Sequence, residues 1–309
     1  MRVKDLHLLP PIADGWSHLY VEHCRVDQGD GGIVVHDERG HVQVPCALLS
    51  VLMLGPGSTI THAAIRTLAD CGCSVLWAGE EGVRLYASGT GETRSARNLL
   101  RQARHHADPR RRMSVVRQMY AMRFDDPPPE DVTLKQLRGM EGARVRQAYA
   151  VAAAAWDVEW TGRDYKRTTW DAATPVNRAL SVAASCLYGL SHAAIVSAGY
   201  SPGLGFVHEG KALSFVYDIA DLYRTEVVIQ AAFAAVASGG TDLEGEVRRM
   251  SREAFRAANL LGRIVSDIHS LFAGYEDDAF ADDEALPGGL WDGGSSTVAG
   301  GRNHEPGDS

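Results

Sequence analysis

The chain has 309 residues, of which 45% are hydrophobic and 23% are charged. This balance is typical of a soluble globular protein with one large or two ordinary domains. We see no apolar run near the roughly 18 residues of a membrane span and no apolar core of a signal peptide, so we expect a cytoplasmic protein with no membrane partner.

The net charge of −8 is unevenly distributed. Residues 275–309 hold nine of the 39 acidic residues and one of the 31 basic ones, which leaves 30 of each sign in residues 1–274. Between Arg94 and Arg123 there are nine arginines and a single acid, Asp108. A neutral body with such a basic segment can still attract a phosphate backbone.

Short segments with β-branched residues predict strands over residues 17–90. "HLYVEHCRV" and "GIVVHDERGHVQV" read as strands, with a hairpin turn at "DERG", and "LLSVLML" is an apolar strand closed by "GPG". "THAAIRTLADCG" predicts a helix that begins after Thr61 and ends at Gly72. "SVLWAG" and "GVRLYAS" predict another hairpin.

Helical spacing dominates after Gly91. A helical segment over 93–122 is interrupted at Asp108–Pro109, and "FDDPPPED" predicts a loop because prolines cannot continue a helix. Further helices are expected over 133–156, with a buried alanine-rich end, over 175–199, over 214–238, and as a pair within 241–272.

The predicted fold class is therefore α+β. A β-rich, sandwich-like domain is expected over residues 1–91 and an all-helical domain over 92–275. The acidic, glycine-rich tail over 276–309 is expected to be disordered. Five scattered cysteines indicate free thiols in a reducing compartment.

An acidic pair lies among apolar residues of the helix expected over 214–238. Asp218 and Asp221 are three residues apart and share a helix face, and His208 precedes them on a loop. Burying carboxylates is costly unless a basic partner, a shared proton or a metal neutralises them. Pairing with arginines of a neighbouring helix is one interpretation. The other is a metal site, and carboxylates with imidazole suit Mg²⁺ or Mn²⁺ better than zinc.

A metal site would need another carboxylate, and Glu141 in "LRGMEGARVR" is the best candidate. Gly139 and Gly142 flank it, and glycine in a helix costs about 1 kcal/mol relative to alanine. The glycines therefore suggest close approach by a partner backbone or a ligand. A salt-bridged helix with glycines for packing is the competing interpretation.

A basic stripe marks the first helix of the second half. Its arginines recur at steps of three and four residues on one helix face: Arg94, Arg97, Arg101 and Arg104. Because almost no acids accompany them, the stripe indicates phosphate contact rather than a merely solvated face.

Five ordered stretches resemble the CRISPR-associated integrase, the DNA-cutting and joining subunit of the spacer-acquisition complex. They are "MLGPGSTITHAAIR", "WAGEEGVRLYASG", "QLRGMEGARVR", "SCLYGL" and "GYSPGLGFVHEGKALSFVYDIADL". The resemblance is closest to the subtype that works with Cascade. It implies a β domain before a helical catalytic domain, and a metal held by Glu141, His208 and Asp221 with Asp218 as an accompanying acid.

The resemblance also implies the reaction and the partners. The 3′-hydroxyl of a captured DNA fragment would attack a phosphodiester at the edge of the CRISPR repeat, with help from Mg²⁺ or Mn²⁺. The chain would bind double-stranded DNA, both fragment and repeat, as a homodimer that flanks a small ferredoxin-like subunit.

Further positions match residues expected near DNA. The expected phosphate contacts outside the stripe are Arg66, Arg84, Arg163 and Lys211. The expected contacts to the fragment end or its motif are His23, Tyr165, Tyr188 and Tyr217. The chain departs from its relatives at two positions, with His23 where a tyrosine wedge is expected and Thr59 where an arginine is expected.

Two other functions use the same residues. One is a stand-alone metal-dependent phosphodiesterase that acts on branched or repair-intermediate DNA. The other is a non-catalytic DNA scaffold, against which the intact Glu, His and Asp set argues.

Overall fold

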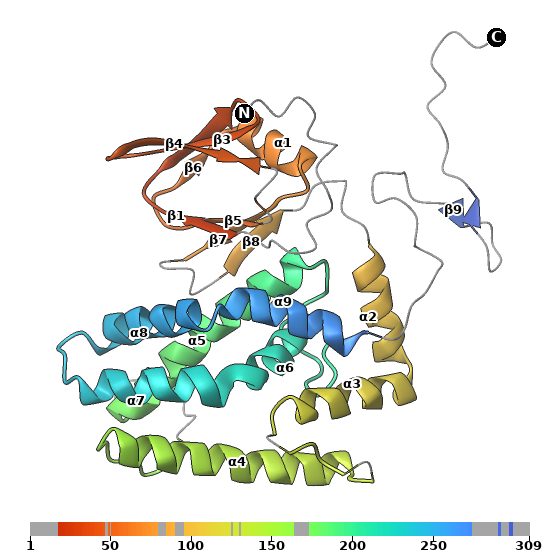
Figure 1. Ribbon diagram of the computed structural model, residues 1–309, viewed down its shortest axis with the longest axis vertical. Helices are drawn as coiled ribbons and strands as arrows, with labels where there is room; N and C mark the ends of the chain where they lie inside the picture. The colour runs from red at the N-terminus through yellow and green to blue at the C-terminus, as the bar shows by residue number, and fades with distance from the viewer. Residues whose placement is uncertain are drawn as a thin grey trace.

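The computed structural model describes residues 18–46, 49, 51–79, 85–89, 96–124, 126–129, 131–163, 173–273, 290–291 and 297–298. Within this part of the chain, two small sheets and a helix come first, and helices follow from Arg97 onward (Figure 1). The predicted α+β class is confirmed. The exact domain boundaries stay predictions.

The strands form two four-stranded sheets. The first has the order β1-β5-β7-β8 and the second β4-β3-β2-β6. The bounds are β1 His18–Val21, β2 Arg25–Gly29, β3 Gly32–Asp37, β4 Gly40–Pro45, β5 Val51–Leu54, β6 Thr59–Ile60, β7 Ser74–Ala78 and β8 Leu85–Gly89. The two predicted hairpins are present, because β3 pairs antiparallel with β4 and β7 pairs antiparallel with β8.

Between the sheets lies one apolar core, which also contains α1 (His62–Asp70). Val26 and Ile33 come from one sheet, Leu52 from the other and Leu68 from α1, and all four side chains are fully buried. The stretch "HLYVEHCRV", which reads as one strand in the sequence, is split between β1 and β2. The chain leaves the first sheet after Val21 and joins the second at Arg25, so β1 and β2 pair with different strands.

Helices dominate the described chain after the two sheets. Their bounds are α2 Arg97–Ala107, α3 Pro109–Ala121, α4 Leu134–Ala155, α5 Pro175–Ser197, α6 Ser214–Tyr223, α7 Ile229–Ala237, α8 Leu243–Ala257 and α9 Leu260–Leu271. A π-helical segment, η5 (Arg224–Val228), joins α6 to α7. The helix expected over 214–238 therefore exists, but a wider turn interrupts it.

Polar side chains set the helix ends that the sequence predicts. The Thr61 hydroxyl accepts a hydrogen bond from Ala64 N–H at the start of α1. Asp108 separates α2 from α3 and accepts from the N–H groups of Arg110 and Arg111. Each bond satisfies a backbone donor that the first helical turn would leave unpaired.

α5 is the central helix of the large apolar core. It contacts α6, α7, α8 and α9, and Ala193 packs against β5 and β7 of the first sheet. By length and composition α5 could cross a membrane, contrary to the expectation from the sequence. However, 67% of its most apolar stretch is buried inside the protein. Its apolar residues therefore serve the core.

The alanine-rich end of α4 differs from its prediction. It was expected to be buried, but Val151 is 57% exposed and Trp156 is 41% exposed. That prediction was wrong, because only Tyr149 and Ala152 of this end are buried.

The predicted disordered tail lies outside the described residues, apart from two short paired strands, β9 (Leu290–Trp291) and β10 (Thr297–Val298).

Candidate active site

A fully buried carboxylate organises the loop that carries the candidate histidine. Asp218 Oδ2 accepts hydrogen bonds from the N–H groups of Phe206 at 2.5 Å and Val207 at 3.0 Å. Asp218 Oδ1 accepts from His208 N–H at 2.9 Å and contacts His208 Nδ1 at 2.7 Å. The carboxylate is thus paired by three backbone donors and one imidazole, which supplies the compensation that burial requires.

His208 is held at the edge of this arrangement with 43% of its side chain exposed. The hydrogen bond to Asp218 raises the pKa of His208, although burial opposes the increase. Its ring packs edge-on against Tyr217 at 5.8 Å, and Tyr217 packs edge-on against Tyr188 at 5.1 Å. Two tyrosines predicted at the fragment end therefore lie beside the candidate histidine.

Glycine is required where this loop returns toward α6. A Cβ at Gly205 would lie 2.4 Å from the carbonyl oxygen of His208 and 2.7 Å from Cβ of Ser214. Such contacts are too short for any side chain, so a larger residue would displace the His208 loop.

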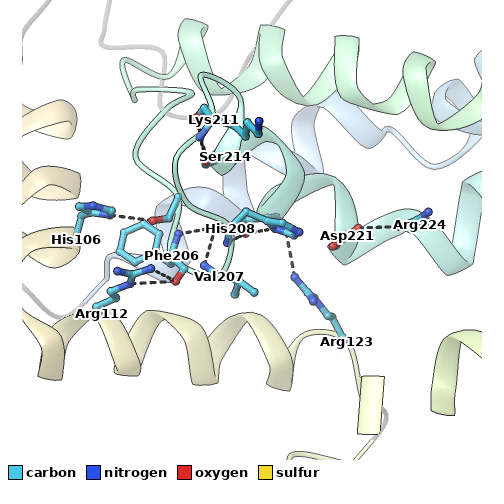
Figure 2. Close-up of polar contacts among 12 residues, drawn as sticks. His106, Arg112, Arg123, Phe206, Val207, His208, Lys211, Ser214, Asp221 and Arg224 are labelled. Carbon is cyan, nitrogen blue, oxygen red and sulfur yellow. Dashed lines mark hydrogen bonds and ion pairs between the residues drawn. The ribbon is translucent and has the colours of Figure 1, made fainter. Parts of the chain in front are cut away.

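Asp221 lies one helical turn beyond Asp218, near His208 (Figure 2). Its side chain is 21% exposed and pairs with Arg224 at 3.4 Å, three residues further along. The two aspartates of the sequence pair thus have different surroundings: Asp218 faces the buried loop, and Asp221 remains accessible.

Glu141 enters from α4 and is held by an arginine. Arg144 donates to both Glu141 oxygens at 3.1 and 3.2 Å, and it donates to Thr225 Oγ1 at 2.9 Å. Thr225 belongs to η5, so Arg144 connects the Glu141 helix to the helix that carries Asp221. Apart from its chain neighbours and the backbone of its own helix, no heavy atom of the described chain lies within 4 Å of a Cβ placed at Gly139. Gly139 is therefore not required here for close packing of another described segment against α4.

Tyr120 and Arg123, at the end of α3, interact with the acidic residues of the candidate site. Burial raises the pKa of Tyr120, and Arg123 opposes the increase, whereas the carboxylates of Glu141 and Asp221 add to it. Arg123 is 5% exposed, lies over the Tyr120 ring and donates to the carbonyl oxygen of Asp218 at 3.2 Å. Neither Tyr120 nor Arg123 was identified from the sequence, because nothing in the local pattern separates them from an ordinary helix end.

The candidate metal ligands are not arranged for coordination. Within the described part of the chain, no group of three or more His, Cys, Asp or Glu side chains lies close enough to hold a metal ion. Arginines engage both carboxylates, since Glu141 faces Arg144 and Asp221 faces Arg224. The donor set of two accessible carboxylates and one imidazole does fit a hard divalent ion. Binding would require Glu141 to turn from Arg144.

The basic stripe lies on α2, where Arg97 and Arg104 are exposed and Arg101 is half-buried. Arg66 is exposed on α1 and Lys211 on the His208 loop. Three predicted contacts, Arg84, Arg94 and Tyr165, lie outside the described residues.

Arg163 is engaged within the protein. Its guanidinium donates to the main-chain and side-chain oxygens of Asn177, both at 2.9 Å, and to Ser181 Oγ at 3.0 Å. These bonds attach Arg163 to the first turns of α5. A contact between Arg163 and DNA would therefore have to coexist with this structural role.

His23 lies at the point where the chain passes between the two sheets. It is exposed and has φ 48°, and its N–H donates to the carbonyl of Pro56 at 2.9 Å. A Cβ at Gly57 would lie 2.4 Å from His23 Nδ1, so the histidine ring packs directly on the turn after β5. Thr59 is exposed on β6.

Comparison with known proteins identifies the family. The model of the CRISPR associated protein Cas1 family matches residues 18–126 and 128–251. The CRISPR-associated endonuclease Cas1 2 of Thermus thermophilus is 53% identical over 293 residues, which cover 94% of this chain and 90% of the relative. The CRISPR-associated endonuclease Cas1 1 of Rhodospirillum rubrum is 47% identical over 272 residues, which cover 85% and 87%.

A solved structure agrees with these relatives. The crystal structure of a TtCas1–DNA complex has 54% sequence identity and a TM-score of 0.79, covering 86% of this chain and 100% of that chain. The chain therefore belongs to the Cas1 family of CRISPR-associated proteins and is an endonuclease and integrase of CRISPR spacer acquisition.

Proposed function

We propose that Glu141, His208 and Asp221 bind a divalent metal ion, Mg²⁺ or Mn²⁺, for strand joining. The observation that carries this proposal is the contact between His208 Nδ1 and the buried Asp218 carboxylate at 2.7 Å. A carboxylate on one ring nitrogen fixes the orientation of the imidazole and leaves Nε2 to coordinate a metal. Asp218 is then a positioning residue and not a ligand.

In the proposed reaction, the 3′-hydroxyl of a captured DNA fragment attacks the phosphorus of a phosphodiester at the edge of the CRISPR repeat. A new P–O bond forms, the bond from phosphorus to the 3′-oxygen of the adjoining strand breaks, and that strand leaves with a 3′-hydroxyl that takes up a proton. A divalent ion at this site supplies Lewis-acid polarisation of the scissile phosphate. Lys211 and Arg144 provide positive charge for the phosphate oxygens. Tyr217, which packs edge-on against His208, and Tyr188, which packs edge-on against Tyr217, contact the end of the fragment. Cleavage of branched DNA follows from the same chemistry.

The proposed assembly is a homodimer that flanks a small ferredoxin-like subunit and binds duplex DNA in the cytoplasm. We assign it to the Cascade-associated subtype from the five ordered stretches described above. A crystal structure of the similar TtCas1 in complex with DNA supports a role for this fold in DNA binding.

The basic stripe is proposed to contact DNA phosphates. Replacing Arg97, Arg101 and Arg104 by glutamine is expected to reduce the salt dependence of duplex binding. This slope of log K against log salt is negative, and its magnitude should fall by about 2–3, because each lost phosphate contact contributes roughly 0.9. Fluorescence anisotropy over a salt series measures this slope.

The matched control replaces two arginines on a different helix. Arg248 and Arg249 pair with glutamates of their own helix, α8, and their replacement by glutamine should leave the slope unchanged. Equal slopes for the stripe variant and the parent protein would show that the stripe is only a solvated face.

The proposed function is tested by an integration assay. The protein is incubated with the small subunit, a fragment with free 3′-ends and a supercoiled repeat plasmid, with and without Mg²⁺. We expect joined fragments at repeat edges only with both the metal and the subunit. Joining without metal would contradict the metal assignment. Cleavage of branched DNA that needs metal but no subunit or repeat would favour the stand-alone phosphodiesterase.

A further inference from the structure

The loop that carries His208 is held on its far side by α2 and α3. His106 of α2 and Arg112 of α3 lie on one side of Phe206 and His208, and α6 lies on the other (Figure 2). Asp218 of α6 accepts from the N–H of Phe206. Three side chains of this basic segment make the contacts: Gln102 and His106 of α2, and Arg112 of α3.

Gln102 makes the first of these contacts with its whole amide group. It is fully buried, and its Nε2 donates to the carbonyls of Ser201 and Leu204, each at 3.0 Å. Its Oε1 accepts from Ser201 N–H at 2.7 Å. Three hydrogen bonds from one buried side chain fix the backbone at two points of the loop, and each buried group would be unsatisfied without its partner.

Two further side chains continue this row toward the histidine. The ring of His106 contacts the carbonyl of Gly205 through Nδ1 at 2.8 Å. Arg112 donates to the carbonyl of Phe206 through Nε at 3.0 Å and Nη2 at 2.7 Å, and it also pairs with Glu209. Because Asp218 holds the N–H of Phe206, the loop is fixed from both sides directly before His208.

The same helix carries the basic stripe on the side turned away from the loop. At about 100° per residue, Arg101, Arg97 and Arg104 lie roughly 100°, 140° and 160° around the helix from Gln102. An α-helix moves as one element, so a phosphate backbone on the stripe restrains the face that holds the loop. Phosphate contact and loop position are thereby physically linked through a contiguous, hydrogen-bonded path.

We propose that Gln102 is a positioning residue that couples duplex binding on α2 to the order of the His208 loop. The loop-ordering part depends only on the hydrogen bonds above. Its consequence for strand joining rests on the proposed function, since it requires His208 to serve the reaction. DNA bound to the stripe restrains the motion of α2. The hydrogen bonds of Gln102 extend this restraint to residues 201–208.

The test measures amide hydrogen exchange of the loop in Gln102→Leu without metal, with and without duplex DNA. We expect exchange in residues 201–208 to be about tenfold faster in Gln102→Leu than in the parent protein. We expect duplex DNA to slow this exchange in the parent protein but not in the variant. In joining assays kcat should fall about tenfold, while the Kd for duplex DNA stays unchanged.

The matched control is Gln118→Leu, which removes a similar contact elsewhere. Gln118 lies on α3 and donates to the carbonyl of Ser270 at 2.9 Å, away from the loop. Its replacement should leave loop exchange and kcat unchanged. Gln102→Met, which keeps the length of the side chain but loses all three hydrogen bonds, should show the same effects if Gln102→Leu does not fold.

Several results would overturn the proposal. One is parent-like loop exchange in both Gln102 variants, and another is duplex DNA that does not change loop exchange in the parent protein. An equal loss of kcat in Gln118→Leu would show a general effect of stability. If instead His208 proves not to bind metal, the exchange results still decide whether Gln102 orders the loop, so the two failures are distinguishable.

Discussion

Asp218→Ala is expected to lower the free energy of unfolding by about 3–5 kcal/mol, because several backbone donors would lose a buried acceptor at about 1–3 kcal/mol each. The carboxylate is fully buried and accepts from three backbone N–H groups and from His208, all of which would lose their partner. Urea denaturation measures the change. Strand joining should also fall by about 10–100-fold, since the histidine would lose its orienting partner.

A second substitution separates loss of fold from loss of position. Asp218→Asn keeps the volume of the side chain but directs an amide NH₂ toward backbone donors, so joining should still fall in a protein that folds. Asp267→Asn is the control, because the Asp267 carboxylate accepts from the Tyr223 hydroxyl at 2.5 Å and, among the described residues, holds no loop backbone. It should cost about 1 kcal/mol and leave joining unchanged. Parent-like joining and stability in Asp218→Asn would refute the positioning role.

Local chemistry made most of the helices predictable. Thr61 and Asp108 accept hydrogen bonds from the first turn of a helix, and Pro175 occupies the start of α5. Such signals act within a few residues, so the sequence alone specifies them. The alternation of β-branched residues likewise predicted both hairpins.

Features that depend on distant contacts were not predictable. Nothing local indicates that the chain changes sheets at His23, because the flanking residues have strand character on both sides. The π-helical turn at Arg224–Val228 is similar. Its sequence is an ordinary helical one, and its consequence, the bond from Thr225 to Arg144, depends on the position of α4.

The site shows the same division. The sequence located both aspartates and His208, and it gave a physical reason to expect a neutralising partner. The residue pattern did not distinguish Asp218, which backbone donors satisfy, from Asp221, which stays accessible, and only the family resemblance implied different roles for them. That difference follows from the direction of the loop before α6. Gln102 gave no signal, because an isolated glutamine on a basic helix is ordinary until its buried amide is seen against the loop.

Asp221→Ala is expected to abolish strand joining, by on the order of 10³-fold or more, because it would remove a ligand of the proposed metal ion, which would supply several kcal/mol of transition-state stabilisation. The fold should tolerate this change. Asp221 is 21% exposed, and its pair with Arg224, three residues away on the same helix, is worth about 0.5 kcal/mol. Duplex binding, measured by fluorescence anisotropy, should stay within about twofold of the parent protein because phosphate contacts dominate it.

Variants of the two aspartates should differ in stability and activity. This difference tests the proposal that Asp221 is a metal ligand and Asp218 a positioning residue. Asp218 variants should lose both stability and activity, whereas Asp221→Ala should lose activity alone. Glu226→Gln is the matched control on the same helical segment, since Glu226 is 49% exposed and pairs with Arg263. It should leave joining unchanged. If Asp221→Ala joined fragments at the parent rate with Mn²⁺, Asp221 would not be a ligand, and its pair with Arg224 would be its whole role.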